Sequence, residues 1–276
     1  MACLDAASGV SGDLLLGAVA DAGIPVQSLQ SAVDRLGVDG LRLTATRTTR
    51  AGVAATKVDV IHPPQREYRH LRDVVSLIEA SSLAEEVKAG ALAVFLRLAE
   101  VEAAVHGVPV EDVHFHEVGA ADTLADVVGS VAGLSELGAD ALLIGSINVG
   151  SGQVHCAHGL LPVPAPATLG LLSGWTCHVA GPALELTTPT GAALVTALGR
   201  QVTSPPRMRA QLCGNGAGSS DPLGWPNVLR LMVGEATGLR ALLGEEDTAG
   251  DGGLGGWAQL RARSVRGQPG ALATAE

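Results

Sequence analysis

The longest helical pattern in the chain constrains its fold most. Ser82 and Glu85 have the spacing of a capping box, which predicts a helix start. Gly107 and Pro109 come just after His106 and predict the end of that helix. Its apolar residues recur at helical spacing: Val87, Val94, Phe95, Leu98, Val101 and Val105. A long helix with one apolar stripe must bury that stripe against other elements, so we expect a layered fold.

Shorter helical and extended patterns alternate along the first 236 residues. Helical patterns cover 13–22, 26–36, 70–79, 122–137 and 188–199, and all of them except 70–79 end at Gly or Pro. Alternating or apolar segments predict strands near 2–4, 41–45, 58–60, 141–149, 207–213 and 227–233. The predicted fold class is therefore α+β, a mixed β-sheet with helices packed against it.

The domain organisation follows from where these patterns stop. Residues 1–236 are expected to form one domain, which could divide into two subdomains near 140–150. Residues 237–276 are rich in Gly and Ala and have no apolar period, so we expect a low-complexity, disordered tail.

Composition narrows the class of partner. Apolar residues make up 47% of the chain and aromatic residues only 2%, so the core must consist of Leu, Val and Ala. The net charge of −10 and the few aromatic side chains argue against a nucleic-acid partner. We expect no membrane span and no signal peptide, because apolar runs are short and no positive segment precedes the first one. The four cysteines form no CxxC pair, which favours reduced thiols and a cytoplasmic location.

Two histidines and two carboxylates lie within ten residues, in a chain with eight histidines. In extended backbone, His114 and His116 point to the same face. Glu117 follows them, and Asp122 and Asp126 lie one turn apart at a predicted helix start. Nitrogen and oxygen ligands together suit a transition metal, so these five residues are candidates for metal binding or catalysis. A strand edge whose histidines bond to a helix start would give the same pattern.

The turn after the first predicted strand has features of an anion site. It is rich in Gly and Ser and has an aspartate at each end: Asp5, Ser8, Gly9, Ser11, Gly12 and Asp13. Free N–H groups at a helix start attract anions, so the serines and glycines could hold a phosphate and either aspartate its metal ion. The spacing matches neither the P-loop nor the dinucleotide-binding motif. Asp13 is equally compatible with an ordinary first-turn carboxylate.

Two further segments offer metal ligands. Glu102 and His106 lie four residues apart on the long helix, a spacing that suits chelation and equally a surface pair. His155, Cys156 and His158 lie within four residues, which would suit an open or shared metal site rather than a closed zinc finger.

Three hydroxyl side chains surround a later predicted helix start. Thr187, Thr188 and Thr190 are compatible with an anion cradle and equally with an ordinary N-cap. The Gly-rich loop at 214–221 is similar to phosphate loops, but a strand follows it, so we discount it.

These motifs, taken in order, resemble the LarC family, the nickel insertion proteins of nickel-pincer nucleotide cofactor synthesis. The resemblance covers residues 2–236. It depends on the segments 4–13, 99–107, 113–122, 148–166 and 185–191, and is extended by Asp221 and by 226–230.

The resemblance implies CTP-dependent insertion of nickel into pyridinium-3,5-bisthiocarboxylic acid mononucleotide, with magnesium or manganese accompanying the CTP. The product has two Ni–S bonds and one Ni–C bond and serves lactate racemase. A ring carbon must therefore lose its proton as nickel binds it. On this resemblance, His114, His116 and Glu117 hold nickel or take the proton, with His155 and His158 close by. It also implies a homo-oligomer.

One departure affects what this chain can do alone. Family members usually continue into a further domain associated with CTP, and here the resemblance ends near Glu235. Three functions stay open: a nickel insertase, acting alone or with a separate C-terminal half; a nickel- or substrate-binding half without turnover; and, from the residues alone, a metal-dependent hydrolase.

Overall fold

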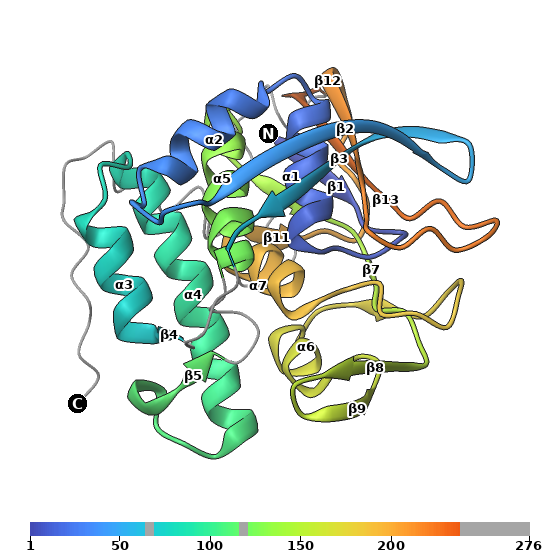
Figure 1. Ribbon diagram of the computed structural model, residues 1–276. Coiled ribbons are helices and arrows are strands. Elements are labelled where there is room, and N and C mark those ends of the chain that lie inside the picture. The colour runs from blue at the N-terminus through green and yellow to red at the C-terminus, as the bar shows by residue number, and fades with distance from the viewer. Residues whose placement is uncertain (64–68, 116–120, 238–276) are drawn as a thin grey trace.

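The computed structural model describes residues 1–63, 69–115 and 121–237, and it contains a seven-stranded sheet (Figure 1). In sheet order, the strands are β11 (Gly199–Gln201), β6 (Leu142–Ile144), β1 (Ala2–Asp5), β13 (Val228–Ala236), β12 (Met208–Ala217), β3 (Val53–Ile61) and β2 (Arg42–Arg50). Strand β6 pairs in parallel with β1 and β11, and β3 with β12. The other neighbours are antiparallel, so the expected mixed sheet is confirmed.

Helices cover the sheet in successive layers. They are α1 (Gly12–Asp21), α2 (Val26–Asp34), α3 (Leu71–Ala80), α4 (Glu85–His106), α5 (Ala121–Glu136), α6 (Pro166–Leu171) and α7 (Pro189–Leu198). Helix α1 lies on β12 and β3, α5 packs on α1, and α4 packs on α5 and α7. The α+β class is therefore confirmed.

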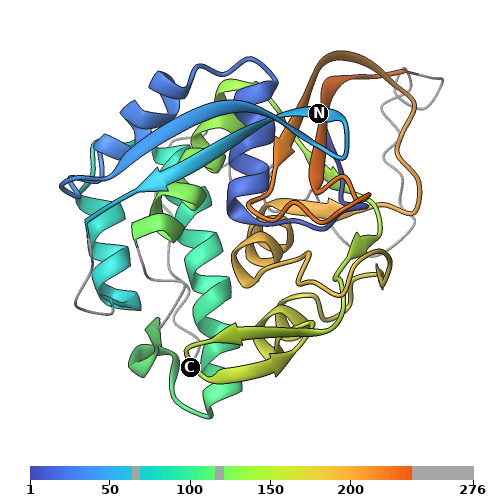
Figure 2. The ribbon, with the colours of Figure 1, turned by 45° about the vertical axis from the view of Figure 1, so that its right-hand side comes forward.

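Short elements complete the described chain. They are β4 (Arg69–His70) with β5 (His114–Phe115), β7 (Ile147–Asn148) with β10 (Cys177–His178), β8 (Gln153–Cys156) with β9 (Gly159–Pro162), and a 3-10 turn, η1 (Val110–Asp112). Figures 1 and 2 show the β8–β9 hairpin beside the C-terminal end of α4, away from the sheet. No helix within the described ranges is long and apolar enough to cross a membrane.

The core is aliphatic, as the composition predicts. Leu, Val and Ala fill most of it, and the rings of Phe95 and Phe115 meet at a centroid distance of 6.3 Å. The predicted stripe on α4 is buried through Val101, but Val105 is exposed near the end of the helix. The sheet also joins both sides of the suggested subdomain boundary, because β6 lies within 140–150 and pairs with β1 and β11.

The predicted capping box at Ser82 is wrong. Helix α4 begins at Glu85 after Ala84, which makes no side-chain cap. Buried Leu83 occupies the connection, so tertiary packing rather than a capping bond determines where the helix begins. A carboxylate does cap α3, where Asp73 accepts a hydrogen bond from the His70 backbone N–H at 3.0 Å.

The first half of the glycine-rich segment after Cys213, residues 214–217, belongs to a strand, and only residues 218–221 form a loop. Strand β12 continues to Ala217, with Gly214 and Gly216 facing α1. A Cβ on Gly216 would lie 1.8 Å from the Leu14 carbonyl oxygen, far inside contact distance. The glycines are therefore needed because the backbone of α1 rests directly on β12.

Candidate functional site

A polar pocket of about 430 Å³ lies where three helices begin beside β3. Its lining residues are Ser11, Gly12, Asp13, Lys57, Val58, Asp59, Val60, Asp122, Thr123, Asp126, Glu185, Thr188, Pro189, Thr190 and Ser219. Several parts of the chain that are distant in sequence thus meet here, and most of the side chains carry oxygen.

Three helix starts face this pocket. Ser11 caps α1, and Leu14 N–H donates to Asp13 Oδ1 at 2.9 Å. Thr188 caps α7 by accepting from Gly191 N–H at 3.2 Å. In the first turn of α5, Thr123 N–H donates to the carboxylate of Asp122. Each helix start carries a partial positive charge, so the three together favour a negatively charged group in the pocket.

The starts of α1 and α7 are tied together by backbone and hydroxyl contacts. Thr188 N–H donates to the Val10 carbonyl oxygen at 3.1 Å, and Val10 N–H donates to Thr187 Oγ1 at 3.2 Å. Thr187 Oγ1 in turn donates to the Asn148 carbonyl at 2.7 Å. A Cβ on Gly191 would lie 2.0 Å from the Val10 carbonyl oxygen, so this approach requires glycine. Fixed contacts therefore set the spacing of the two helix starts.

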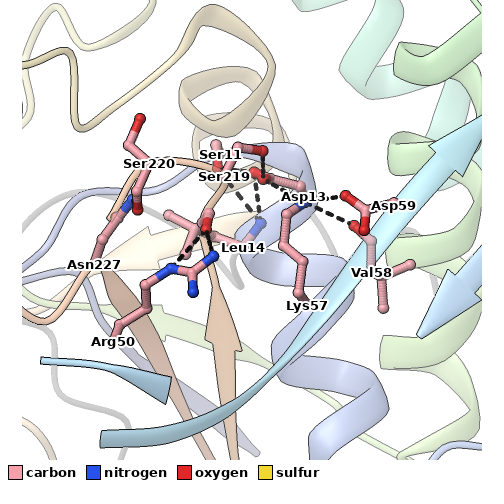
Figure 3. Close-up of polar contacts among 11 residues, drawn as sticks. Ser11, Asp13, Leu14, Arg50, Lys57, Val58, Asp59, Ser219, Ser220 and Asn227 are labelled. Carbon is pink, nitrogen blue, oxygen red and sulfur yellow. Dashed lines mark hydrogen bonds and ion pairs between the residues drawn. The ribbon is translucent and has the colours of Figure 1, made fainter. Parts of the chain in front are cut away.

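Lys57 brings a buried positive charge to the pocket (Figure 3). Its Nζ lies 3.0 Å from each of three oxygens, those of Asp13 Oδ2, Asp59 Oδ1 and the Val58 carbonyl. Burial opposes the charged form, but Asp13 and Asp59 outweigh it and raise the pKa of Lys57. The ammonium is therefore charged, and it neutralises much of the two carboxylates.

The sequence alone does not predict Lys57 as a site residue. It lies in β3 between Thr56 and Val58, where a single lysine reads as an ordinary polar position of a half-exposed strand. Its partner Asp13 is 44 residues away in sequence. The one hint that Lys57 belongs to the site is its contact with the predicted residue Asp13, and only the fold brings the two together.

Asp126 contributes a carboxyl group of which one oxygen has no hydrogen-bond partner. Its Oδ1 is withdrawn from solvent and bonds to no described group. A Cβ on Gly12 would lie 2.3 Å from Asp126 Oδ2, so the missing side chain makes room for this carboxyl. Burial, then the charges of Asp13 and Asp122, raise the pKa of Asp126 well above its usual range.

This carboxyl should make the stability of the chain depend on pH. The pKa of Asp126 is higher in the folded chain than its unperturbed value of 3.8. The folded state therefore loses stability relative to the unfolded state as pH rises above 3.8, and loses none below that pH. At pH 8 in EDTA, Asp126→Asn should therefore have a higher Tm than wild type. Each kcal/mol by which the variant is more stable should raise the Tm by roughly 2–4 °C. The gap should close near pH 4, and exposed Asp39→Asn is the control. A gap that does not grow with pH would contradict this prediction.

A segment between β12 and β13 closes one side of the pocket. Ser219 Oγ donates to Asp13 Oδ2 at 3.0 Å. Arg50 holds the preceding residue, because its Nε and Nη2 donate to the Gly218 carbonyl at 3.1 and 2.8 Å. Asn227 Nδ2 donates to the Ser220 carbonyl at 2.9 Å. Ser219 lies in the loop that the sequence argument discounted, so Asp13 has a hydroxyl partner that was not predicted.

The structure separates the predicted residues of the first turn. Ser11, Gly12 and Asp13 line the pocket. Ser8, by contrast, is buried and donates to the Pro226 carbonyl at 2.6 Å. Gly9 has a φ of +81° and packs against a backbone carbonyl of the 185–191 segment, and it does not line the pocket.

The predicted metal ligands do not form one cluster. Asp5 pairs with Arg230 on the neighbouring strand and lies outside the pocket lining. Among His, Cys, Asp and Glu side chains of the described ranges, no group of three is arranged to hold a metal ion. Asp13 and Asp126, also predicted as ligands, do line the pocket.

A second group of predicted ligands meets at the end of α4. His106 Nε2 lies 3.3 Å from Glu102 Oε2, and the ring of His158 lies 4.9 Å from that of His106. His155 is exposed on β8 of the same hairpin. None of these side chains lines the pocket. The structure thus brings His106 and His158, two histidines distant in sequence, together at a place separate from the pocket, a pairing that the sequence did not predict.

The histidine-rich motif is described only in part. His114 lies in β5, where its backbone pairs with that of His70 in β4. His116 and Glu117 lie outside the described residues, as does the predicted tail from residue 238. Asp122, the last residue of the motif, lines the pocket from α5.

The fold and the pocket define a class: an α+β protein with a polar, oxygen-lined cavity where three helices start, a kind of site that binds small polar molecules. Residues 2–251 match the family model described as "Nickel insertion protein". The chain belongs to this nickel insertion protein family.

Three relatives share the name "Pyridinium-3,5-bisthiocarboxylic acid mononucleotide nickel insertion protein". The protein of a Nocardioides species is 49% identical over 84% of this chain, that of Geobacillus kaustophilus 41% over 85%, and that of Desulfitobacterium hafniense 43% over 91%. These matches cover 59%, 59% and 60% of the relatives, so the chain spans about three fifths of their length. No solved structure matches the chain.

Proposed function

We propose that this chain is the nickel-handling part of a cytoplasmic enzyme that inserts nickel into pyridinium-3,5-bisthiocarboxylic acid mononucleotide with the help of CTP. The observation that carries the proposal is the 49% identity, over 84% of this chain, to the Nocardioides protein named for that insertion. The pocket supports it, because a cavity of about 430 Å³ at three helix starts suits a small phosphorylated molecule.

Nickel and the nucleotide have different ligand preferences, and the structure offers two matching regions. Nickel suits imidazole and sulfur ligands, which the oxygen-lined pocket does not supply. His106 and His158, with Glu102 beside them, form a nitrogen-rich group at the end of α4. We place incoming nickel there or on His114 and His116, and the nucleotide in the pocket.

The reaction also needs a proton acceptor. When nickel binds the ring carbon, the C–H bond breaks, its electron pair forms the Ni–C bond, and the proton leaves. The acceptor is proposed among His114, His116, Glu117 and Asp122. Of these, Asp122 lies at the pocket, on the first turn of α5.

A specific alternative divides the reaction between two polypeptides. The matched relatives extend well beyond the region that they share with this chain. In that alternative, a separate C-terminal half supplies CTP binding with magnesium or manganese, and the present chain binds nickel or substrate within a homo-oligomer. Turnover then requires both halves.

A nickel insertion assay tests the proposal. It would contain the purified chain, nickel, CTP, magnesium and the bisthiocarboxylate mononucleotide, with and without the C-terminal portion of the Nocardioides relative. We expect nickel-bearing product, at least when that portion is added, and a loss of about 100-fold for His114→Ala/His116→Ala. His62→Ala is the matched control and should stay active. A folded chain that yields no product in either mixture would contradict the proposal.

A further inference from the structure

The charges that line the pocket do not balance. Lys57 is the one basic side chain among the described lining residues. The acidic ones are Asp13, Asp59, Asp122, Asp126 and Glu185. The helix starts favour a phosphate, but the carboxylates outnumber the single ammonium and would repel it. A ligand that suits both features must bring positive as well as negative charge.

Carboxyl groups here are available to a cation to different degrees. Asp13 and Asp59 already share the ammonium of Lys57 at 3.0 Å, and Asp13 also accepts from Ser219. Asp126 Oδ1 has no described hydrogen-bond partner and no contact with solvent. A buried polar atom without a partner is costly, and a bound cation would remove that cost. Asp126 is therefore the carboxyl group that a bound cation would stabilise most.

The protein alone does not complete a cation site. Among the described residues, no three His, Cys, Asp or Glu side chains form a cage for a metal ion. Magnesium usually binds without such a cage, because one or two carboxylates, several waters and phosphate oxygens of the substrate hold it together. Phosphate and cation would then each complete the site of the other.

We propose that this pocket binds a phosphate group together with a hard divalent cation, and that each binds weakly without the other. The phosphate lies at the starts of α1 and α7, within reach of Thr188, Thr190 and Lys57, and the cation lies beside Asp126. The inference relies on the proposed function only for the molecule that carries the phosphate, namely the mononucleotide substrate.

Calorimetric titration of the full chain with ribose 5-phosphate tests this pairing. We expect saturating Mg²⁺ to tighten ribose 5-phosphate binding at least about tenfold over EDTA, and ribose 5-phosphate to tighten Mg²⁺ binding by the same factor. Unphosphorylated ribose should bind in neither condition. Equal affinity for ribose 5-phosphate in magnesium and in EDTA would overturn the proposal.

Variants locate the coupling in this pocket. Asp126→Asn removes the proposed cation ligand and should reduce the magnesium effect to less than twofold. Thr190→Val removes a side-chain hydroxyl that is proposed to bind the phosphate, and it should weaken ribose 5-phosphate binding several-fold. Exposed Glu79→Gln on α3 is the matched control and should behave as wild type. A full magnesium effect in folded Asp126→Asn would show that the pair binds elsewhere.

The outcome is separable from that of the insertion assay. Nickel insertion without magnesium coupling would leave the proposed function intact and refute the phosphate–cation pair. Coupling without insertion would support the pair and count against the proposed function. The two assays share no readout, because ribose 5-phosphate lacks the ring that accepts nickel.

Discussion

Lys57→Met is expected to destabilise the folded chain by about 2–3 kcal/mol and to abolish ribose 5-phosphate binding. Removing one partner of a buried ion pair leaves an uncompensated charge, which typically costs about 3–5 kcal/mol. The ammonium is buried and serves Asp13 and Asp59, but Asp59 is 54% exposed, so solvent screening lowers the expected cost. Urea denaturation measures the stability, and calorimetry measures the binding.

A surface ion pair provides the control for Lys57. Arg97 pairs with Glu100 on α4, where the side chains are 35% and 59% exposed. Arg97→Met should cost less than about 1 kcal/mol and leave ribose 5-phosphate binding unchanged. If Lys57→Met unfolds the chain, Lys57→Arg keeps the charge with a different geometry, and binding should still weaken. A Lys57→Met protein as stable as Arg97→Met, with normal binding, would show that Lys57 has no role in the pocket.

Gly216→Ala is expected to destabilise the chain by about 3 kcal/mol. The added Cβ would meet the Leu14 carbonyl oxygen at 1.8 Å and the Ala18 nitrogen at 2.5 Å. These are backbone atoms, so α1 must shift as a whole, and overpacking of this kind typically costs about 1–3 kcal/mol or more. Since the start of α1 lines the pocket, ribose 5-phosphate binding should fall as well.

Another glycine separates the steric effect from a general effect of adding a methyl group. Gly145 has nothing within 4 Å of its ideal Cβ position. Gly145→Ala should therefore change the free energy of unfolding by less than about 0.5 kcal/mol in the same urea titration. Equal stabilities for the two variants would mean that α1 does not rest on β12 as described.

The sequence predicts elements well where local pattern and packing agree. The stripe on α4 through Phe95 and Leu98 is buried, and the strand at 227–233 forms the middle of the sheet. It fails where tertiary contacts decide. At Ser82, the burial of Leu83 overrides a locally reasonable cap, and at Gly216, the reason for glycine lies in a helix about 200 residues earlier in the chain.

The site divides in the same way. Helix-start chemistry predicted Asp13 and Thr188, and the motif of histidines and carboxylates predicted Asp126. The structure brings these three residues to one pocket. Lys57 was not predicted, because a lysine in a strand shows nothing of carboxylates that only the fold brings near. Ser8 has the residue type of a phosphate ligand, yet it is used to hold the segment before β13.

The most direct test of the central claim is a crystal structure of the chain with the bisthiocarboxylate mononucleotide and magnesium. The phosphorus atom should lie at the starts of α1 and α7, close to Lys57 and Thr190, with a cation beside Asp126. The pyridinium ring should occupy the rest of the same pocket. A nucleotide bound elsewhere, for instance against the β8–β9 hairpin, with this pocket filled only by water, would contradict the account.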